Sequence, residues 1–160
     1  MSALNDIVAT YGGPRRVIRR VLGDGVNEPR ALAILLAGCI VVFVAQWPRL
    51  ARLAQIEGQE LNPLLGGALL AWLFIMPLVL YTLALISHWV LRALGGQGHP
   101  YSARIALFWA LLATAPIMLL WGLTAGFVGP GAALTLVGVV WLGMFLWVWI
   151  SGLAEAWRKI

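Results

Sequence analysis

Four long runs of apolar residues set the pattern of this chain. They cover residues 31–47, 64–91, 105–127 and 132–154, and none of them contains a lysine, arginine, aspartate or glutamate. An α-helix rises about 1.5 Å per residue, so about 20 apolar residues cross a hydrocarbon core about 30 Å thick. The pattern therefore predicts an all-α, polytopic helical membrane protein with four transmembrane helices.

The polar segments divide the rest of the chain into an arm, loops and a tail. Residues 1–30 form the predicted arm, residues 31–154 the transmembrane domain and residues 155–160 the tail. The first predicted loop covers Pro48–Pro63, because the missing N–H of proline costs little outside a helix. With 62% hydrophobic and 11% charged residues, the chain has too few charges to cover a soluble globule of its length.

The basic residues predict the orientation of the chain. Nine of the eleven lysines and arginines lie in the arm, at the second loop or in the tail, while Arg49 and Arg52 lie in the first loop. Short segments rich in Lys and Arg stay on the cytoplasmic side of a membrane. We therefore expect both termini to be cytoplasmic, which agrees with an even number of spans.

The N-terminal arm contains a short amphipathic pattern. Pro14 suits the first turn of a helix, and two kinds of side chain then separate onto two faces. The apolar face carries Val17, Ile18, Val21 and Leu22. The basic face carries Arg15, Arg16, Arg19 and Arg20. We expect this helix to lie flat on the cytoplasmic leaflet, with the four arginines binding anionic lipids.

Proline and glycine residues inside the runs predict bends and close contacts. Pro77 and Pro116 each remove one backbone hydrogen bond, so we expect local kinks there, favouring a static kink over a gating hinge. Gly122 and Gly126 form a GxxxG pattern, which allows two helices to approach closely. The pattern fits packing within one chain as well as oligomer formation.

Nine tryptophans also mark this chain, and some of them line one side of the fourth run. Trp141, Phe145 and Trp149 recur every four residues and predict an aromatic ridge. Such a ridge contacts lipid, another helix, a quinone-like or pigment ligand, or a partner subunit. Lipid contact or helix packing is favoured, because no ligand-specific residue accompanies the rings.

Candidate chemistry is sparse. The two histidines, His88 and His99, have no Cys, Asp or Glu at a metal-ligand spacing and no carboxylate to orient them. We therefore expect no catalytic site, no cofactor and no metal. A coupled transporter normally has an ionisable residue at membrane depth. The four apolar runs contain no lysine, arginine, aspartate or glutamate, so coupled transport is disfavoured. No basic stripe with interleaved aromatics supports nucleic-acid binding.

One segment resembles a known family. Residues 94–101 read Leu-Gly-Gly-Gln-Gly-His-Pro-Tyr and lead into a run with Ala-Thr-Ala-Pro at 113–116. A Leu-Gly-Gly-x-Gly turn before such a span is similar to bacterial members of the Yip domain family, over residues 30–154. The resemblance implies a multi-pass membrane protein without catalysis. Eukaryotic Yip proteins act in vesicle trafficking and interact with Rab GTPases. Family members usually have five spans, whereas four are predicted here. The acidic N-terminal region of the eukaryotic members is replaced here by a short basic arm, so no Rab-binding residue is carried over.

These patterns lead to one favoured function and two alternatives. We expect a non-enzymatic protein of a bacterial inner membrane with a membrane-organising or scaffolding role. The first alternative is an accessory or assembly subunit of a larger membrane complex, and the second is a small transporter or channel. The expected partners are anionic lipids, other membrane proteins or a second copy of the chain, and not nucleic acid.

Overall fold

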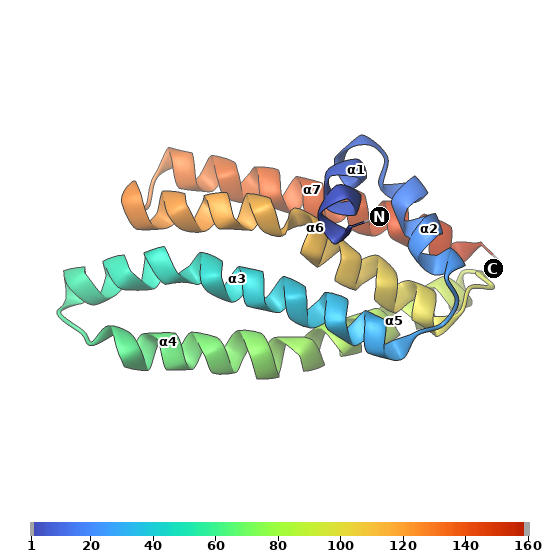
Figure 1. The fold of residues 1–160 in the computed structure, drawn as a ribbon, viewed down its shortest axis with the longest axis horizontal. Helices are drawn as coiled ribbons and strands as arrows, with labels where there is room; N and C mark the ends of the chain where they lie inside the picture. The colour runs from blue at the N-terminus through green and yellow to red at the C-terminus, as the bar shows by residue number, and fades with distance from the viewer. Residues whose placement is uncertain (1, 159–160) are drawn as a thin grey trace.

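The structure is a computed structural model that describes residues 2–158, and every regular element in that range is a helix (Figure 1). The elements are α1 (Ala3–Gly12), α2 (Pro14–Gly23), α3 (Glu28–Glu57), α4 (Leu61–Leu70), the π-helical segment η1 (Ala71–Ile75), α5 (Met76–Ala93), α6 (Pro100–Phe127) and α7 (Ala132–Trp157). Four helical stretches are long and apolar enough to cross a membrane: α3, the continuous α4–η1–α5, α6 and α7. The all-helical architecture is therefore confirmed for the described residues, with four helical stretches that are long and apolar enough to span a membrane.

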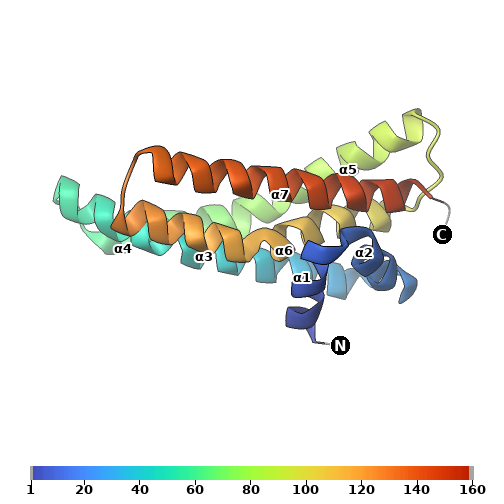
Figure 2. The same cartoon turned by 90° about the horizontal axis from the view of Figure 1, so that it is seen from above.

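The third span lies at the centre of the bundle. Helix α6 packs against α3 on one side and α7 on the other, and α5 also contacts it (Figures 1 and 2). In the most apolar stretch of each span, 67% of the residues of α6 and 44% of those of α3 are buried, compared with 11% for α4–α5 and 6% for α7. The second and fourth spans therefore present broad apolar faces outward.

Small residues bring α3 and α6 into backbone contact. A Cβ atom added at Gly122 would lie 1.8 Å from the carbonyl oxygen of Ala45, and one at Gly126 would lie 2.4 Å from Cβ of Pro48. At Gly38 of α3 the contact is looser, because an added Cβ would lie 3.1 Å from Cδ2 of the Leu111 side chain of α6. Glycine is thus required where the axes approach most closely, and the GxxxG pattern lies at a contact within the chain.

The first predicted loop, residues 48–63, is too long, because helices cover most of it. Helix α3 does not end before Pro48 but continues to Glu57, and Gly58 ends it with a left-handed φ of 65°. Arg52, in this extension, donates from Nη1 to the carbonyl oxygen of Gly126 over 3.2 Å. Packing against α6 and this bond hold the extra turns together, despite the hydrogen bond that Pro48 removes.

The two prolines within the spans are accommodated differently. Pro77 follows η1, where the N–H of Met76 bonds to the carbonyl of Ala71, five residues back. This wider turn absorbs the missing donor without ending the span. Pro116 lies inside α6, which continues through it, and α6 changes direction in its middle in Figure 1.

The N-terminal arm folds onto the bundle. Val17, Ile18 and Val21 are 1%, 0% and 2% exposed because α2 packs against α6 and α7. A Cβ added at Gly152 of α7 would lie 2.8 Å from Cδ1 of Ile18, so this glycine makes room for the contact. The amphipathic helix is present, but the expectation that its apolar face enters the leaflet is wrong, because the protein itself covers that face.

The other boundaries shift by a few residues. Helix α3 already starts at Glu28, inside the predicted arm, and α7 continues through the first part of the predicted tail to Trp157. Met1 of the arm and Lys159 and Ile160 of the tail lie outside the described residues.

Candidate functional site

The bundle has two different ends. The end that we call the terminal end comprises α2, the loop Leu94–His99 and the last turns of α7 (Figure 1). The end that we call the hairpin end comprises the loops between α3 and α4 and between α6 and α7. Most of the candidate polar groups gather at the terminal end.

Helix α1 is joined to the middle of α6 by two hydrogen bonds. The indole Nε1 of Trp109 donates to Oγ1 of Thr10 over 3.0 Å, and both groups are buried. The phenol of Tyr11 donates to the carbonyl oxygen of Ala113 over 2.6 Å. Two polar side chains of the arm are thus satisfied by α6, and α1 has a fixed position.

The bond from Tyr11 lies beside the bend of α6. Ala113 is three residues before Pro116, where the proline ring disturbs the hydrogen-bond ladder. The side chain of Thr114 also bonds back, from Oγ1 to the carbonyl of Ala110 over 2.7 Å. Partial burial raises the pKa of Tyr11, so the phenol stays protonated and remains a donor at neutral pH. The arm therefore supports the kinked segment from outside.

An ion pair fixes α2 to the end of α7. Nε and Nη2 of Arg19 donate to the two carboxylate oxygens of Glu155 over 3.2 and 3.0 Å. The Glu155 side chain is 4% exposed, whereas that of Arg19 is 63% exposed. This hydrogen bond and the negative charge of Glu155 raise the pKa of Arg19. The sequence assigned Glu155 to the tail and missed this role, although it is the acidic residue directly after an apolar run.

The four predicted lipid-binding arginines divide into two pairs. Arg19 bonds to Glu155, and Arg20 bonds to Asp6 of α1 over 2.9 Å. Arg15 and Arg16 are exposed, and within residues 2–158 neither forms an ion pair. Arg19 therefore fixes the arm to α7, Arg20 joins α2 to α1, and Arg15 and Arg16 are left exposed at the surface.

The glycine-rich loop closes tightly over the end of α7. A Cβ added at Gly98 would lie 1.6 Å from the carbonyl oxygen of Ala156, and the N–H of Gln97 donates to the carbonyl of Trp157 over 3.4 Å. Gly95 adopts a φ of 95°, which favours glycine. The loop is thus built for close packing.

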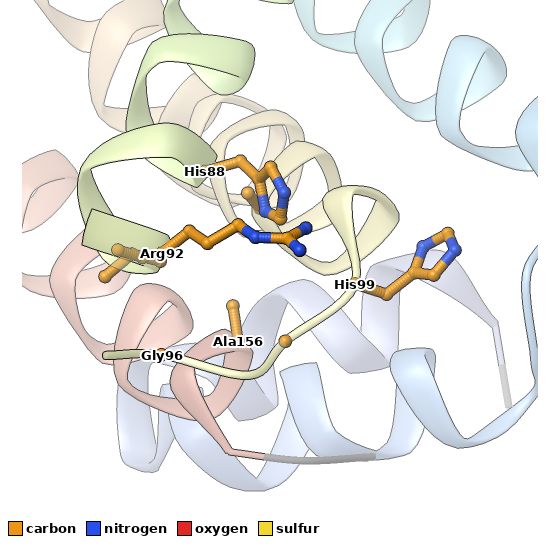
Figure 3. Close-up of a pocket in the computed structure, with 8 residues that line it drawn as sticks. His88, Arg92, Gly96, His99 and Ala156 are labelled. Atoms are coloured by element: carbon orange, nitrogen blue, oxygen red, sulfur yellow. The ribbon is translucent and has the colours of Figure 1, made fainter. Parts of the chain in front are cut away.

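Both histidines line one small pocket, but their rings do not converge in it. The side chains of His88 and Arg92 extend into a small pocket beside Gly96 and Ala156, whereas the ring of His99 points away from them (Figure 3). Nδ1 of His99 accepts the N–H of Tyr101 over 3.1 Å and so caps α6. Within the described part of the chain, no group of three or more His, Cys, Asp or Glu residues could hold a metal.

The aromatic ridge faces partly inward. The rings of Trp141 and Phe145 stack with centroids 5.4 Å apart, and those of Phe145 and Trp149 lie 5.9 Å apart. Phe145 and Trp149 pack against the core, while the exposed side of α7 carries Trp147 and Ile150. For Phe145 and Trp149, contact with the other helices agrees with helix packing, which the sequence favoured together with lipid contact.

Comparison with known proteins gives no relative from which to transfer a function. No family model, no curated protein and no solved structure matches this chain.

Proposed function

We propose that this chain is a non-enzymatic multi-pass protein with a membrane-organising or scaffolding role in a bacterial inner membrane. The observation that carries the proposal is the arm folded onto the terminal end, with Arg15 and Arg16 exposed beside the spans. Each arginine near an anionic membrane surface contributes about 1 kcal/mol to attraction. A rigidly held basic patch of this kind gathers anionic lipids around the bundle.

The orientation follows from the same charges. Nine of the eleven basic residues belong to the side of the arm and tail, so the terminal end faces the cytoplasm. The resemblance of residues 94–101 to the Yip turn agrees with this placement and with a protein that lacks catalysis.

An accessory or assembly subunit of a larger complex is the second candidate. It is favoured by the apolar faces of α4–α5 and α7, whose most apolar stretches are only 11% and 6% buried. Such faces contact either lipid or the spans of a partner. Stoichiometric co-purification with one defined complex in mild detergent supports this function, and a chain that purifies alone or only with itself contradicts it.

A transporter or channel is the third candidate and has less support. The apolar runs carry no charged residue, and Gly122 brings α6 against α3 at the centre of the bundle. Flux of ions or small solutes in proteoliposomes would favour it over scaffolding.

The lipid-gathering role is tested with the full chain in nanodiscs that contain spin-labelled phosphatidylglycerol or phosphatidylcholine. We expect more motionally restricted phosphatidylglycerol than phosphatidylcholine around the wild-type protein. The variant Arg15→Gln/Arg16→Gln should lose much of this preference, and the charge-preserving control Arg15→Lys/Arg16→Lys should keep it. Equal restriction of the two lipids by the wild-type protein would contradict the proposal.

A further inference from the structure

The hairpin end contains an apolar cleft with two arginines on its wall. The cleft has a volume of about 360 Å³ and lies between the end of α3, the end of α6 and the start of α7. Its lining includes Arg49, Arg52, Leu53, Ile56, Trp121 and Leu134. Cationic side chains and an apolar interior thus meet in one place, at the end of the membrane spans.

Arg52 is held in position but uses few of its donors. Its Nη1 donates to the carbonyl of Gly126 in the last turn of α6, where the partial negative charge of the helix end favours a cation. The guanidinium lies against Gly129, where an added Cβ would be 2.7 Å from Nη2. Its Nε is covered from solvent and has no acceptor among residues 2–158. A guanidinium has five N–H donors, so donors remain for a ligand.

Arg49 lies one turn before Arg52 on the same helix. It is exposed, and its Nε bonds to Oε1 of Gln46 over 3.1 Å. Neither arginine forms an ion pair with a described carboxylate, whereas Arg19, Arg20, Arg30 and Arg104 all do. Two neighbouring positive charges on a helix repel each other, and an anion between them would remove the repulsion.

We propose that this cleft binds an anionic phospholipid. Arg49 and Arg52 hold its phosphate, and one acyl chain lies along Leu53, Trp121 and Leu134. Guanidinium groups match the oxygens of a phosphate in a bidentate manner. A free phosphate would leave the apolar cleft without an occupant, whereas a lipid satisfies both parts. The site is at the opposite end from Arg15 and Arg16, so it goes beyond the proposed function and stands or falls separately.

The test uses the purified full chain in detergent with phosphatidylglycerol that carries a photoactivatable acyl chain. Phosphatidylcholine with the same acyl chain is the matched lipid. After illumination and digestion, mass spectrometry maps the adducts. We expect phosphatidylglycerol adducts on Leu53, Trp121 or Leu134, reduced about tenfold in the variant Arg49→Gln/Arg52→Gln. The variant Arg15→Gln/Arg16→Gln removes the same charge elsewhere and should keep them.

Arg52 also caps α6, so Arg49→Gln alone provides a variant that keeps this bond. Its labelling should fall several-fold, and unchanged labelling would overturn the proposal. Equal labelling of the cleft by phosphatidylcholine would do the same, because it would show ordinary lipid contact. Binding of inorganic phosphate by the wild-type protein but not by Arg49→Gln, without phosphatidylglycerol adducts in the cleft, would assign the arginines to a free anion. Crosslinks between two chains through Trp121, without lipid adducts, would assign the cleft to a second copy.

Discussion

Replacing Gly122 by alanine should loosen the contact between the two most buried spans. The new Cβ would lie 1.8 Å from the carbonyl oxygen and 2.7 Å from the carbonyl carbon of Ala45. Both atoms belong to the backbone of α3, so no side-chain rotation relieves the overlap and the helices must move apart. Overfilling a packed interior by a methyl group typically costs about 1–3 kcal/mol.

A matched control separates this cost from helix propensity. Alanine is favoured over glycine within helices by about 1 kcal/mol, and this gain applies equally to Gly122→Ala and to the control variant Gly143→Ala. Gly143 lies within α7, and a Cβ added there meets nothing within 4 Å. The difference between Gly122→Ala and Gly143→Ala therefore isolates the overlap. At about 2–4 °C per kcal/mol for a domain of this size, it corresponds to about 2–12 °C in the unfolding midpoint.

The chain contains its own reporter for this measurement. Cys39 is the only cysteine, lies on α3 and is 0% exposed. A thiol-reactive fluorogenic maleimide therefore labels it only when α3 separates from its neighbours on heating. We expect the labelling midpoint of Gly122→Ala to lie below that of Gly143→Ala. A midpoint equal to or above that of the control would refute the close contact between α3 and α6.

Three further predictions concern the arm. Tyr11→Phe should speed hydrogen exchange in α1 at neutral pH, because it removes a bond worth about 1 kcal/mol. Because burial raises the pKa of Tyr11, its phenol keeps its proton, and its hydrogen bond, below pH 10.0. Protection of the α1 amides against hydrogen exchange in the wild-type protein should therefore hold below pH 10.0 and fall as the pH rises through the raised pKa. Tyr11→Phe should abolish this pH dependence. Ile18→Ala should loosen α2 from the bundle and speed its cleavage by trypsin, because truncating a fully buried isoleucine costs about 2–5 kcal/mol. Val26→Ala, at an exposed position, should leave the cleavage rate unchanged. Arg19→Ala should lower the Cys39 labelling midpoint more than Arg19→Ala/Glu155→Gln does, because only the single variant leaves a buried charge unpaired.

The four apolar helical stretches could be predicted from the sequence because each depends only on the composition of its own segment. Each run of 17 or more uncharged residues indicates a span on its own, and α3, α4–α5, α6 and α7 contain the four runs. The amphipathic pattern likewise predicted α2 together with its two faces. Composition and periodicity are sufficient for such elements, since neither depends on a distant partner.

The docked arm and the extent of α3 depend on distant residues and were not predictable in this way. A buried face and a lipid-bound face have the same apolar composition, so the pattern of α2 did not show that Ile18 packs beside Gly152. The path of α3 through Pro48 depends on Gly126, and the role of Glu155 depends on Arg19. In each case, the deciding partner lies more than 70 residues away in the chain.

The pairing of Arg19 with Glu155 has a consequence for biosynthesis. The two residues are separated by 136 positions, and Thr10 is separated from Trp109 by 99. At roughly 5–20 residues per second, a ribosome that has made Arg19 needs on the order of ten seconds to reach Glu155. Until α7 is made, α2 lacks the part of its docking surface that α7 supplies, and its apolar and basic faces suit the surface of an anionic leaflet. We therefore expect α2 to lie on the leaflet at this stage and to dock onto the protein once α7 is in place.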